Sequence, residues 1–148
     1  MDKQEQKIQK KIKELNDCQG NYKKINARLK RKRLRWIKEN KDKLNLTSSL
    51  PRQAYEILFF QYMNLDPREV PVIYEDEKKI VWRSYNFCPV LEACKKLKLD
   101  TRIVCKKGLE ESVQDFVGCI DSRLKFSRSY KKIRPYKEYC EESIELIG

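Results

Sequence analysis

The chain has 148 residues, a formal net charge of +12, six cysteines and no histidine. The lack of histidine excludes imidazole metal ligands, Ser-His-Asp triads and Cys-His dyads, so a bound metal would need thiolate, carboxylate or backbone ligands. Apolar residues make up 40% of the chain, which is enough for one modest core, and none of their runs approaches the roughly 18 residues of a membrane span.

The first third of the chain is expected to be helical and strongly basic. Residues 2–16 and 21–40 both show the periodicity of an amphipathic helix, and a short break separates them. Residues 1–49 contain 16 Lys and Arg against 6 Asp and Glu, so they carry a net charge of +10. We therefore predict a basic N-terminal helical hairpin, or a basic arm packed on the main body, over residues 1–49. Because residues 1–7 lack the apolar core of a signal peptide, we expect a cytoplasmic protein whose thiols stay reduced.

Residues 50–148 are expected to form one α+β domain. The segment 50–64 is apolar nearly all round, which is typical of a central buried helix. The runs 70–74 and 79–85 favour a β-hairpin. The elements expected after the hairpin are a helix over residues 88–97, a possible strand over 101–105, a helix over 109–120, and strands over 124–130 and 139–147. This order indicates a mostly antiparallel sheet with packed helices.

The candidate metal ligands are four cysteines of this domain: Cys88, Cys94, Cys105 and Cys140. We expect the first, third and fourth of them to approach one another in one pocket, with Cys94 nearby. A zinc ion or an iron–sulfur cluster needs three or four cysteines that converge in this way. No C-x-x-C pair supports a metal, however, and buried cysteines often serve as small apolar side chains. We expect Cys119 to pack in that manner on the apolar face of its helix.

The same cysteines also fit a catalytic site. Cys88 is expected at the start of a helix, where backbone amides and the helix dipole stabilise a thiolate, the reactive form of cysteine. Glu92, one helical turn later, could carry protons in place of a histidine, although an acidic residue is also favourable there for the helix alone. With Cys105 and Cys140 in the same pocket, the pattern indicates a small-molecule-binding domain that acts as a cysteine-dependent hydrolase. The rival hypothesis is a thiolate metal-binding or redox module without turnover.

A basic run makes nucleic acid or another polyanion a candidate partner, because residues 28–38 contain seven cations in eleven positions. The residues expected to contact phosphates are Arg28, Lys30, Arg31, Lys32, Arg33 and Arg35. In that case Trp36 and Ile37 should pack inward while the arginines form one continuous exposed face. The alternative is a solvated helix face that only keeps the protein soluble.

A second basic segment, Phe126–Tyr136, includes Arg128 and Arg134, either of which can bind a carboxylate or a phosphate. The alternative is an exposed sheet edge that charged side chains protect from pairing with other strands. The sequence has no Gly-rich phosphate loop, Walker motif or dinucleotide fingerprint, which disfavours nucleotide-dependent chemistry.

Several short matches lie between residues 88 and 144. They are Cys88-Pro89 at the start of a helix, Leu97-Lys98-Leu99-Asp100, Cys105, Phe116, Leu124-Lys125-Phe126-Ser127-Arg128 and Tyr139-Cys140-Glu141. In these features the stretch resembles the C-terminal part of the L-2-amino-thiazoline-4-carboxylic acid hydrolase-like family. The resemblance implies an α+β fold and the hydrolytic opening of a small cyclic sulfur compound.

Overall fold

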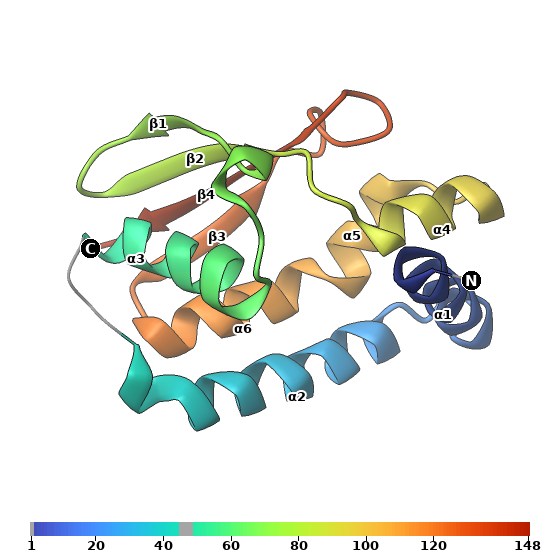
Figure 1. The fold of residues 1–148 in the computed structure, drawn as a ribbon, viewed down its shortest axis with the longest axis horizontal. Helices are drawn as coiled ribbons and strands as arrows, with labels where there is room; N and C mark the ends of the chain where they lie inside the picture. The colour runs from blue at the N-terminus through green and yellow to red at the C-terminus, as the bar shows by residue number, and fades with distance from the viewer. Residues whose placement is uncertain (1, 45–48) are drawn as a thin grey trace.

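The computed structural model describes residues 2–44 and 49–148, and it has the α+β architecture expected from the sequence (Figure 1). Its helices are α1 (Lys3–Asp17), α2 (Lys23–Asn40), α3 (Leu50–Glu56), α4 (Pro89–Leu97), α5 (Thr101–Gly108) and α6 (Glu110–Ile120). Its strands are β1 (Val72–Glu75), β2 (Lys79–Ser84), β3 (Leu124–Arg128) and β4 (Cys140–Leu146). The shorter helical segments are η1 (Lys41–Lys43), η2 (Ile57–Tyr62), which is π-helical and continues α3, and η3 (Pro67–Glu69).

The strands form one antiparallel sheet in the order β1-β2-β4-β3. β1 and β2 make the predicted hairpin, and β4, the last strand in the chain, lies between β2 and β3. Ile144 of β4 is paired with Ile80 on one side and with Phe126 on the other, so the three side chains point to the same face of the sheet. All three are buried. The sheet therefore has an inner face that the helices cover.

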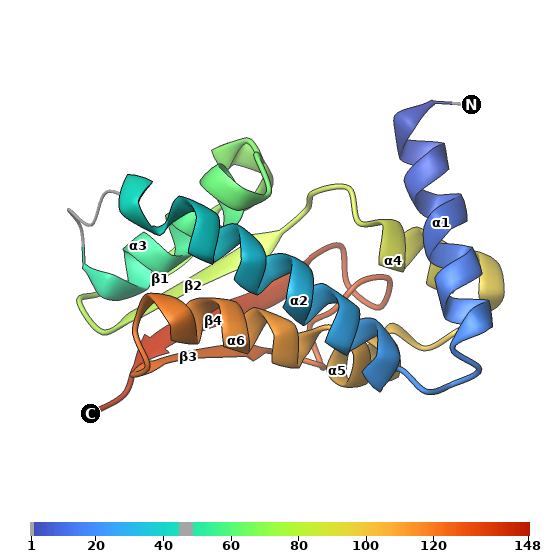
Figure 2. The same cartoon turned by 90° about the horizontal axis from the view of Figure 1, so that it is seen from below.

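Two layers of helix lie over the inner face. α3, η2 and α6 pack directly on the strands, and α2 lies beyond α6 (Figures 1 and 2). The main core fills the space between these layers, and its largest fully buried side chains include Tyr55, Trp82 and Phe116. The predicted central helix over residues 50–64 is confirmed, with a change to π-helical hydrogen bonding at Ile57.

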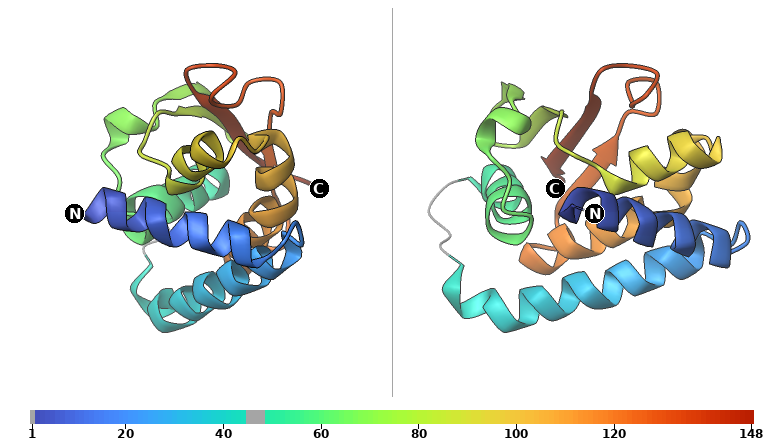
Figure 3. Two further views of the ribbon diagram at one scale, coloured as in Figure 1. Left: turned by 90° about the vertical axis from the view of Figure 1, so that its right-hand side faces the viewer. Right: turned by 45° about the vertical axis from the view of Figure 1, so that its right-hand side comes forward.

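A second, smaller core lies where α1, α4, α5 and the start of α2 meet (Figure 3). Leu15, Ile25, Val90 and Val104 are buried there, and the thiol of Cys94 is enclosed among them. α1 packs on α4 and runs at a steep angle to α2 (Figure 2). The N-terminal segment is therefore an arm packed on the main body, the second of the two predicted arrangements.

The prediction of a strand over residues 101–105 is wrong, because this segment is the first part of α5. Ile103 and Val104 are β-branched and individually favour a strand. Asp100 favours the helix instead: its carboxylate accepts a hydrogen bond from the backbone N–H of Arg102 at 2.9 Å and so caps the first turn.

The helices of the described residues lack the features of a membrane span. Across residues 2–44 and 49–148, no helix combines the length and the apolar character needed to cross a bilayer. The longest helix in these ranges, α2, has 18 residues, and half of them are Lys or Arg.

Candidate functional site

The inner face of the sheet changes from apolar to polar along its strands. At one end it carries large side chains of the main core, which we call the apolar end: Trp82, Phe126 and Ile144. Further along the same strands it carries polar side chains, which we call the polar end: Ser84, Arg128, Cys140 and Glu142. Because side chains two residues apart on a strand share a face, the polar end continues the inner face directly.

An enclosed ion pair lies at the centre of the polar end. Arg128 Nη2 donates to Glu142 Oε2 at 2.9 Å, and Ser84 Oγ donates to Glu142 Oε1 at 2.8 Å. Only 13% of the Arg128 side chain and 7% of the Glu142 side chain are exposed. Burial disfavours the charge of Arg128, but Glu142, together with Cys105 and Tyr130, outweighs this effect and raises the pKa of the guanidinium. Arg128 is therefore a buried cation, and the alternative of an exposed sheet edge is wrong for this residue.

Arg128 has more donors than Glu142 uses. Its Nε and Nη1 atoms are buried and find no acceptor among the described residues, and the same holds for Nε of Arg33 on α2. Burial lowers the pKa of Arg33, and the charge of nearby Arg128 adds to this effect. A buried donor without an acceptor costs roughly 1–3 kcal/mol and is uncommon in proteins. The polar end therefore offers hydrogen-bond donors to an acceptor from outside the chain.

Several thiols lie beside this ion pair. The groups close enough to Cys105, on α5, to act on the pKa of its thiol are Arg128, Cys88, Cys94 and Cys140. Burial has the largest effect and raises the pKa of Cys105 to about 12. Burial also raises the pKa of Cys94 to about 12, with a smaller contribution from Cys88. Both thiols are protonated at neutral pH, and a protonated thiol is a poor nucleophile. The predicted cysteines thus share one region, but the thiols of Cys94 and Cys105 are poor nucleophiles there.

Cys140 has different surroundings. Its Sγ accepts two hydrogen bonds from Arg134, one from Nε at 3.3 Å and one from the backbone N–H at 3.4 Å. Arg134 Nη1 also donates to the carbonyl oxygen of Asn86 at 2.7 Å, which fixes the guanidinium beside the end of β2. Donors on a cation orient a sulfur atom and stabilise negative charge on it during a reaction. Among the predicted cysteines, Cys140 therefore has the contacts best suited to a nucleophile.

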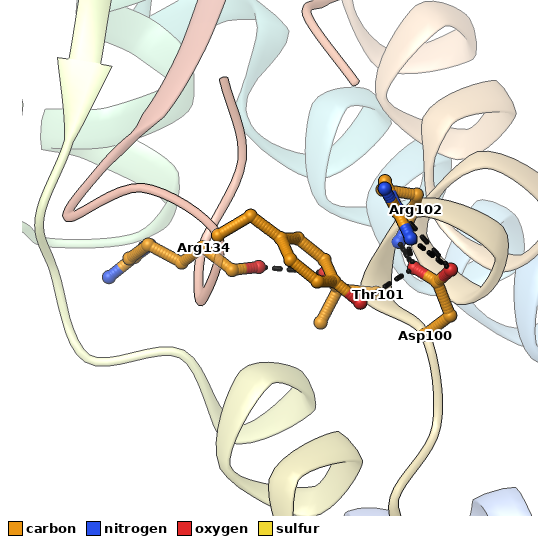
Figure 4. A network of polar contacts seen from close by, with 5 residues as sticks. Asp100, Thr101, Arg102 and Arg134 are labelled. Carbon is orange, nitrogen blue, oxygen red and sulfur yellow. Dashed lines mark hydrogen bonds and ion pairs between the residues drawn. The ribbon is translucent and has the colours of Figure 1, made fainter. Parts of the chain in front are cut away.

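The segment 129–139, which contains Arg134, is tied to α5 (Figure 4). Thr101 Oγ1 donates to the carbonyl oxygen of Arg134 at 2.7 Å. The hydroxyl of Tyr136 donates to the carboxylate of Asp100 at 3.1 Å, just before α5 begins. These contacts hold the backbone of Arg134 next to the polar end.

Asp100 contacts both Arg102 of α5 and Tyr136 of the segment 129–139. Arg102 Nη2 lies 2.9 Å from Oδ2 of Asp100 (Figure 4). The Arg102 guanidinium also lies over the ring of Tyr136, with its Cζ atom 4.2 Å from the ring centroid. The hydrogen bond from Arg102 lowers the pKa of Asp100 to about 2, so this carboxylate is charged throughout the physiological range. Besides capping α5, Asp100 anchors the segment 129–139 through the hydroxyl of Tyr136.

Cys88 and Glu92 occupy the predicted positions on α4. Cys88 precedes the first helical residue, and its thiol is half-buried. Glu92 follows one turn later, and Nζ of Lys95 lies 3.4 Å from its carboxylate. This ion pair fits the alternative of an acid that favours the helix, and the role of Glu92 as a proton carrier stays a prediction.

The described residues give no support to the metal-site prediction. Among them, no group of three or more Cys, Asp or Glu side chains is arranged to hold a metal ion. The candidate ligands that share a region without forming such a group are Cys88, Cys94, Cys105 and Cys140. The prediction that Cys119 packs in the core is wrong, because its thiol is exposed. Cys119 falls outside the buried stripe of α6 that includes Phe116 and Val117.

The predicted basic face of α2 is only partly exposed. Trp36 and Ile37 pack inward as predicted, and the ring of Trp36 stacks on Phe116 with centroids 5.9 Å apart. Arg33 points inward as well, where its guanidinium donates to Ser112 Oγ. The prediction that Arg33 belongs to a continuous exposed face is therefore wrong.

Two residues of the polar end, Ser84 and Glu142, were not among the predicted site residues. The alternation of buried and exposed side chains along each strand points to both residues. Ser84 lies two residues after the buried Trp82, and Glu142 lies two residues before the buried Ile144. In a strand, every second side chain is expected to be buried. A polar residue at one of these positions marks a candidate site residue, and this pattern identifies both Ser84 and Glu142.

No protein-family model, curated protein or solved structure matches this chain. The resemblance of residues 88–144 to the thiazoline-carboxylic acid hydrolase-like family stays a prediction. The geometry of the polar end is therefore the evidence for function.

Proposed function

We propose that the chain binds a small anionic molecule at the polar end of the sheet and acts on it with a cysteine thiol. The observation that carries this proposal is the pair of buried donors, Nε and Nη1 of Arg128, that find no acceptor in the described part of the chain. Carboxylate and phosphate oxygens are the acceptors that match the fork of a guanidinium. A bound anion would supply the missing acceptors.

The charges around the polar end favour an anion. Three guanidinium groups lie in this region, those of Arg33, Arg128 and Arg134. In the described residues, Glu142 is the one carboxylate hydrogen-bonded to any of them. Cys105 stays protonated at neutral pH because burial raises its pKa to about 12, so it adds no negative charge. The local excess of positive charge would stabilise an anionic ligand.

Cys140 is the thiol to which the reaction is assigned. Its sulfur would attack an electrophilic carbon of the bound molecule and form a carbon–sulfur bond, while the thiol proton passes to the leaving group. One water molecule would then break that bond, with its hydroxyl going to carbon and its proton returning to sulfur. The net reaction is a hydrolysis that needs no oxidant. It is the reaction class expected from the sequence as a cysteine-dependent hydrolase.

Alkylation of the intact protein tests the binding part of this proposal. Each cysteine peptide is followed by mass spectrometry after iodoacetamide treatment, with small carboxylates, phosphate or sulfate as candidate ligands. We expect at least one anion to slow the labelling of Cys140 and to leave the exposed Cys119 unchanged. Arg128→Lys keeps the charge but removes the fork, so it should abolish the protection. Protection that survives in Arg128→Lys, or its absence with every anion, would contradict the proposal.

Two further variants separate the candidate nucleophiles. With amides or thioesters that carry the anionic group identified by labelling as test substrates, Cys140→Ser should remove turnover, and Cys88→Ser should retain it. The opposite result would assign the reaction to Cys88, the nucleophile expected from the sequence at the start of α4.

A further inference from the structure

The outer side of α2 carries a line of cations. α2 is the outermost helical layer, and its far side faces away from the rest of the molecule (Figures 1 and 2). Its exposed cations recur at intervals of three and four residues, and we call them the outer stripe: Lys24, Arg28, Arg31, Arg35 and Lys38. At 3.6 residues per turn and 1.5 Å per residue, the stripe covers an arc of about 80° over a length of about 21 Å.

The protein leaves most of this charge unpaired. Arg28 is paired with Glu14 on α1, but the side chains of the other four residues of the outer stripe have no ion pair or hydrogen bond among the described residues. Two of the other four cations of α2 are engaged instead. Lys30 Nζ lies 3.5 Å from Asp115, and Arg33 donates to Ser112. Most of the charge of the outer stripe is thus left for a partner or for counterions.

The positive surface extends beyond α2. Partial burial and the charges of neighbouring cations, among them Arg28 and Lys10, lower the pKa of Lys32. Lys10 belongs to α1, so cations of both N-terminal helices lie close to one another. Self-repulsion of this kind is relieved when a polyanion binds.

The composition of the surface discriminates between kinds of polyanion. Of the large apolar side chains that are exposed in the described residues, none lies on α1 or α2. A helix that lies in a membrane interface needs an apolar face, and the centre of a protein–protein interface is depleted of charged residues. A nucleic acid needs neither feature, because Lys and Arg alone neutralise its phosphates.

We propose that the outer stripe of α2 binds the phosphate backbone of a nucleic acid. One strand of a duplex places a phosphate every 3.4 Å or so, and the stripe is long enough to face about six of them. The outer stripe consists of Lys and Arg on one straight helix face, which contact phosphates whatever the sequence, and Trp36 is packed against Phe116 rather than free to stack on bases. Binding is therefore independent of sequence. This interaction lies outside the proposed action on a small anion and does not depend on it.

Fluorescence anisotropy of the full-length protein tests the proposal. The probes are a labelled DNA duplex and a labelled single-stranded RNA, each about 20 nucleotides long, titrated between about 50 and 200 mM KCl. For the duplex we expect the logarithm of the association constant to fall with the logarithm of salt with a slope of about −4, since the four unpaired cations of the outer stripe each contact one phosphate and each contact contributes roughly −0.9. A second duplex of unrelated sequence should bind with the same affinity.

A stripe variant and a matched control make the test specific. The stripe variant is Lys24→Gln/Arg31→Gln/Arg35→Gln/Lys38→Gln, in which glutamine preserves helix propensity. The control is Lys78→Gln/Lys107→Gln/Lys125→Gln/Lys131→Gln, which removes the same charge from exposed positions elsewhere. We expect the stripe variant to lose tenfold or more in affinity at about 100 mM KCl and the control to stay close to wild type.

Three results would overturn the proposal. One is that the wild-type protein binds neither probe at about 100 mM KCl. Another is that the control loses as much affinity as the stripe variant, which would indicate an effect of net charge alone. The third is that the protein sediments with phosphatidylserine vesicles and not with nucleic acid, which would assign the outer stripe to a membrane surface.

Discussion

The apolar and polar ends of the sheet are built on the same strands and share its inner face, yet they hold opposite kinds of side chain. At the apolar end, Trp82 lies against the rings of Tyr55 and Phe59, with both centroid distances at 5.2 Å. At the polar end, Arg128 and Glu142 take the place of such rings. Packing accounts for the first end. A buried ion pair is often no more stabilising than apolar side chains of the same volume, so the second end is better explained by binding.

Truncation at the apolar end should have the largest effect on stability. Trp82 is fully buried, so Trp82→Ala removes its ring contacts and leaves a cavity. We expect a loss of about 3–5 kcal/mol in the free energy of unfolding, measured by chemical denaturation. A loss below about 1 kcal/mol would mean that the apolar end does not hold the fold together as described.

Breaking the ion pair at the polar end should cost somewhat less. Glu142→Leu leaves the Arg128 cation buried without its carboxylate, and we expect a loss of about 3 kcal/mol. The double variant Arg128→Leu/Glu142→Leu removes both charges and should return to within about 1 kcal/mol of the wild-type free energy of unfolding. The double variant should nevertheless lose anion binding. If it is as unstable as the single variant, the ion pair is needed for the fold, and the contrast between the two ends fails.

The enclosed thiols should make the protein sensitive to alkaline pH. Burial raises the pKa of Cys94 from 9.0 to about 12, so between these values the unfolded chain loses this proton while the folded chain keeps it. Stability is therefore fully present below about pH 9 and falls as the pH rises toward 12. We expect Cys94→Ala to reduce the loss of unfolding free energy between pH 9 and pH 10 by up to about 1 kcal/mol. The exposed Cys119→Ala is the control and should leave the slope unchanged.

The smallest effect concerns the anchor of the segment 129–139. Thr101→Val keeps the shape of a buried side chain but removes the hydrogen bond to the carbonyl oxygen of Arg134. We expect a loss of roughly 0.5–1 kcal/mol in unfolding free energy. We also expect faster alkylation of Cys140, because its sulfur accepts a hydrogen bond from Arg134. Thr101→Ser retains the hydroxyl and should label at the wild-type rate. Equal labelling rates in all three proteins would show that this anchor does not control the thiol.

Much of the fold could be predicted because its signals are local. The apolar segment 50–64, the hairpin strands and the helix that begins after Cys88 each follow from a few neighbouring residues. The strand prediction for residues 101–105 failed because it gave more weight to three β-branched residues than to Asp100, whose side chain caps the helix. The local sequence pattern therefore predicts the type of element correctly unless strand propensity and helix capping disagree.

The site was predicted less completely, because its contacts join residues far apart in the chain. The grouping of Cys105 with Cys88 and Cys140 was expected from their positions. The burial that raises the pKa of the Cys105 thiol and keeps it protonated depends on tertiary packing. The pairing of Arg128 with Glu142 depends on the register between β3 and β4. The inward turn of Arg33 likewise depends on the contact between α2 and α6. A one-residue change in register would move Arg128 to the outer face, so sequence alone does not determine its role.

The most direct test of the proposed anion site is a measurement on the Arg128 guanidinium itself. Its Nε–H group is buried and without an acceptor in the described residues, so its NMR resonance should report any anion that arrives. The resonance is assigned by comparison with Arg128→Lys, and small carboxylates, phosphate and sulfate are titrated into ¹⁵N-labelled protein. We predict a saturable shift of the Arg128 Nε–H signal with at least one of these anions, while the signal of Arg68, which is exposed and paired with Asp66, moves little. A signal for Arg128 that stays fixed with every anion would contradict the claim that the polar end of the sheet is a binding site.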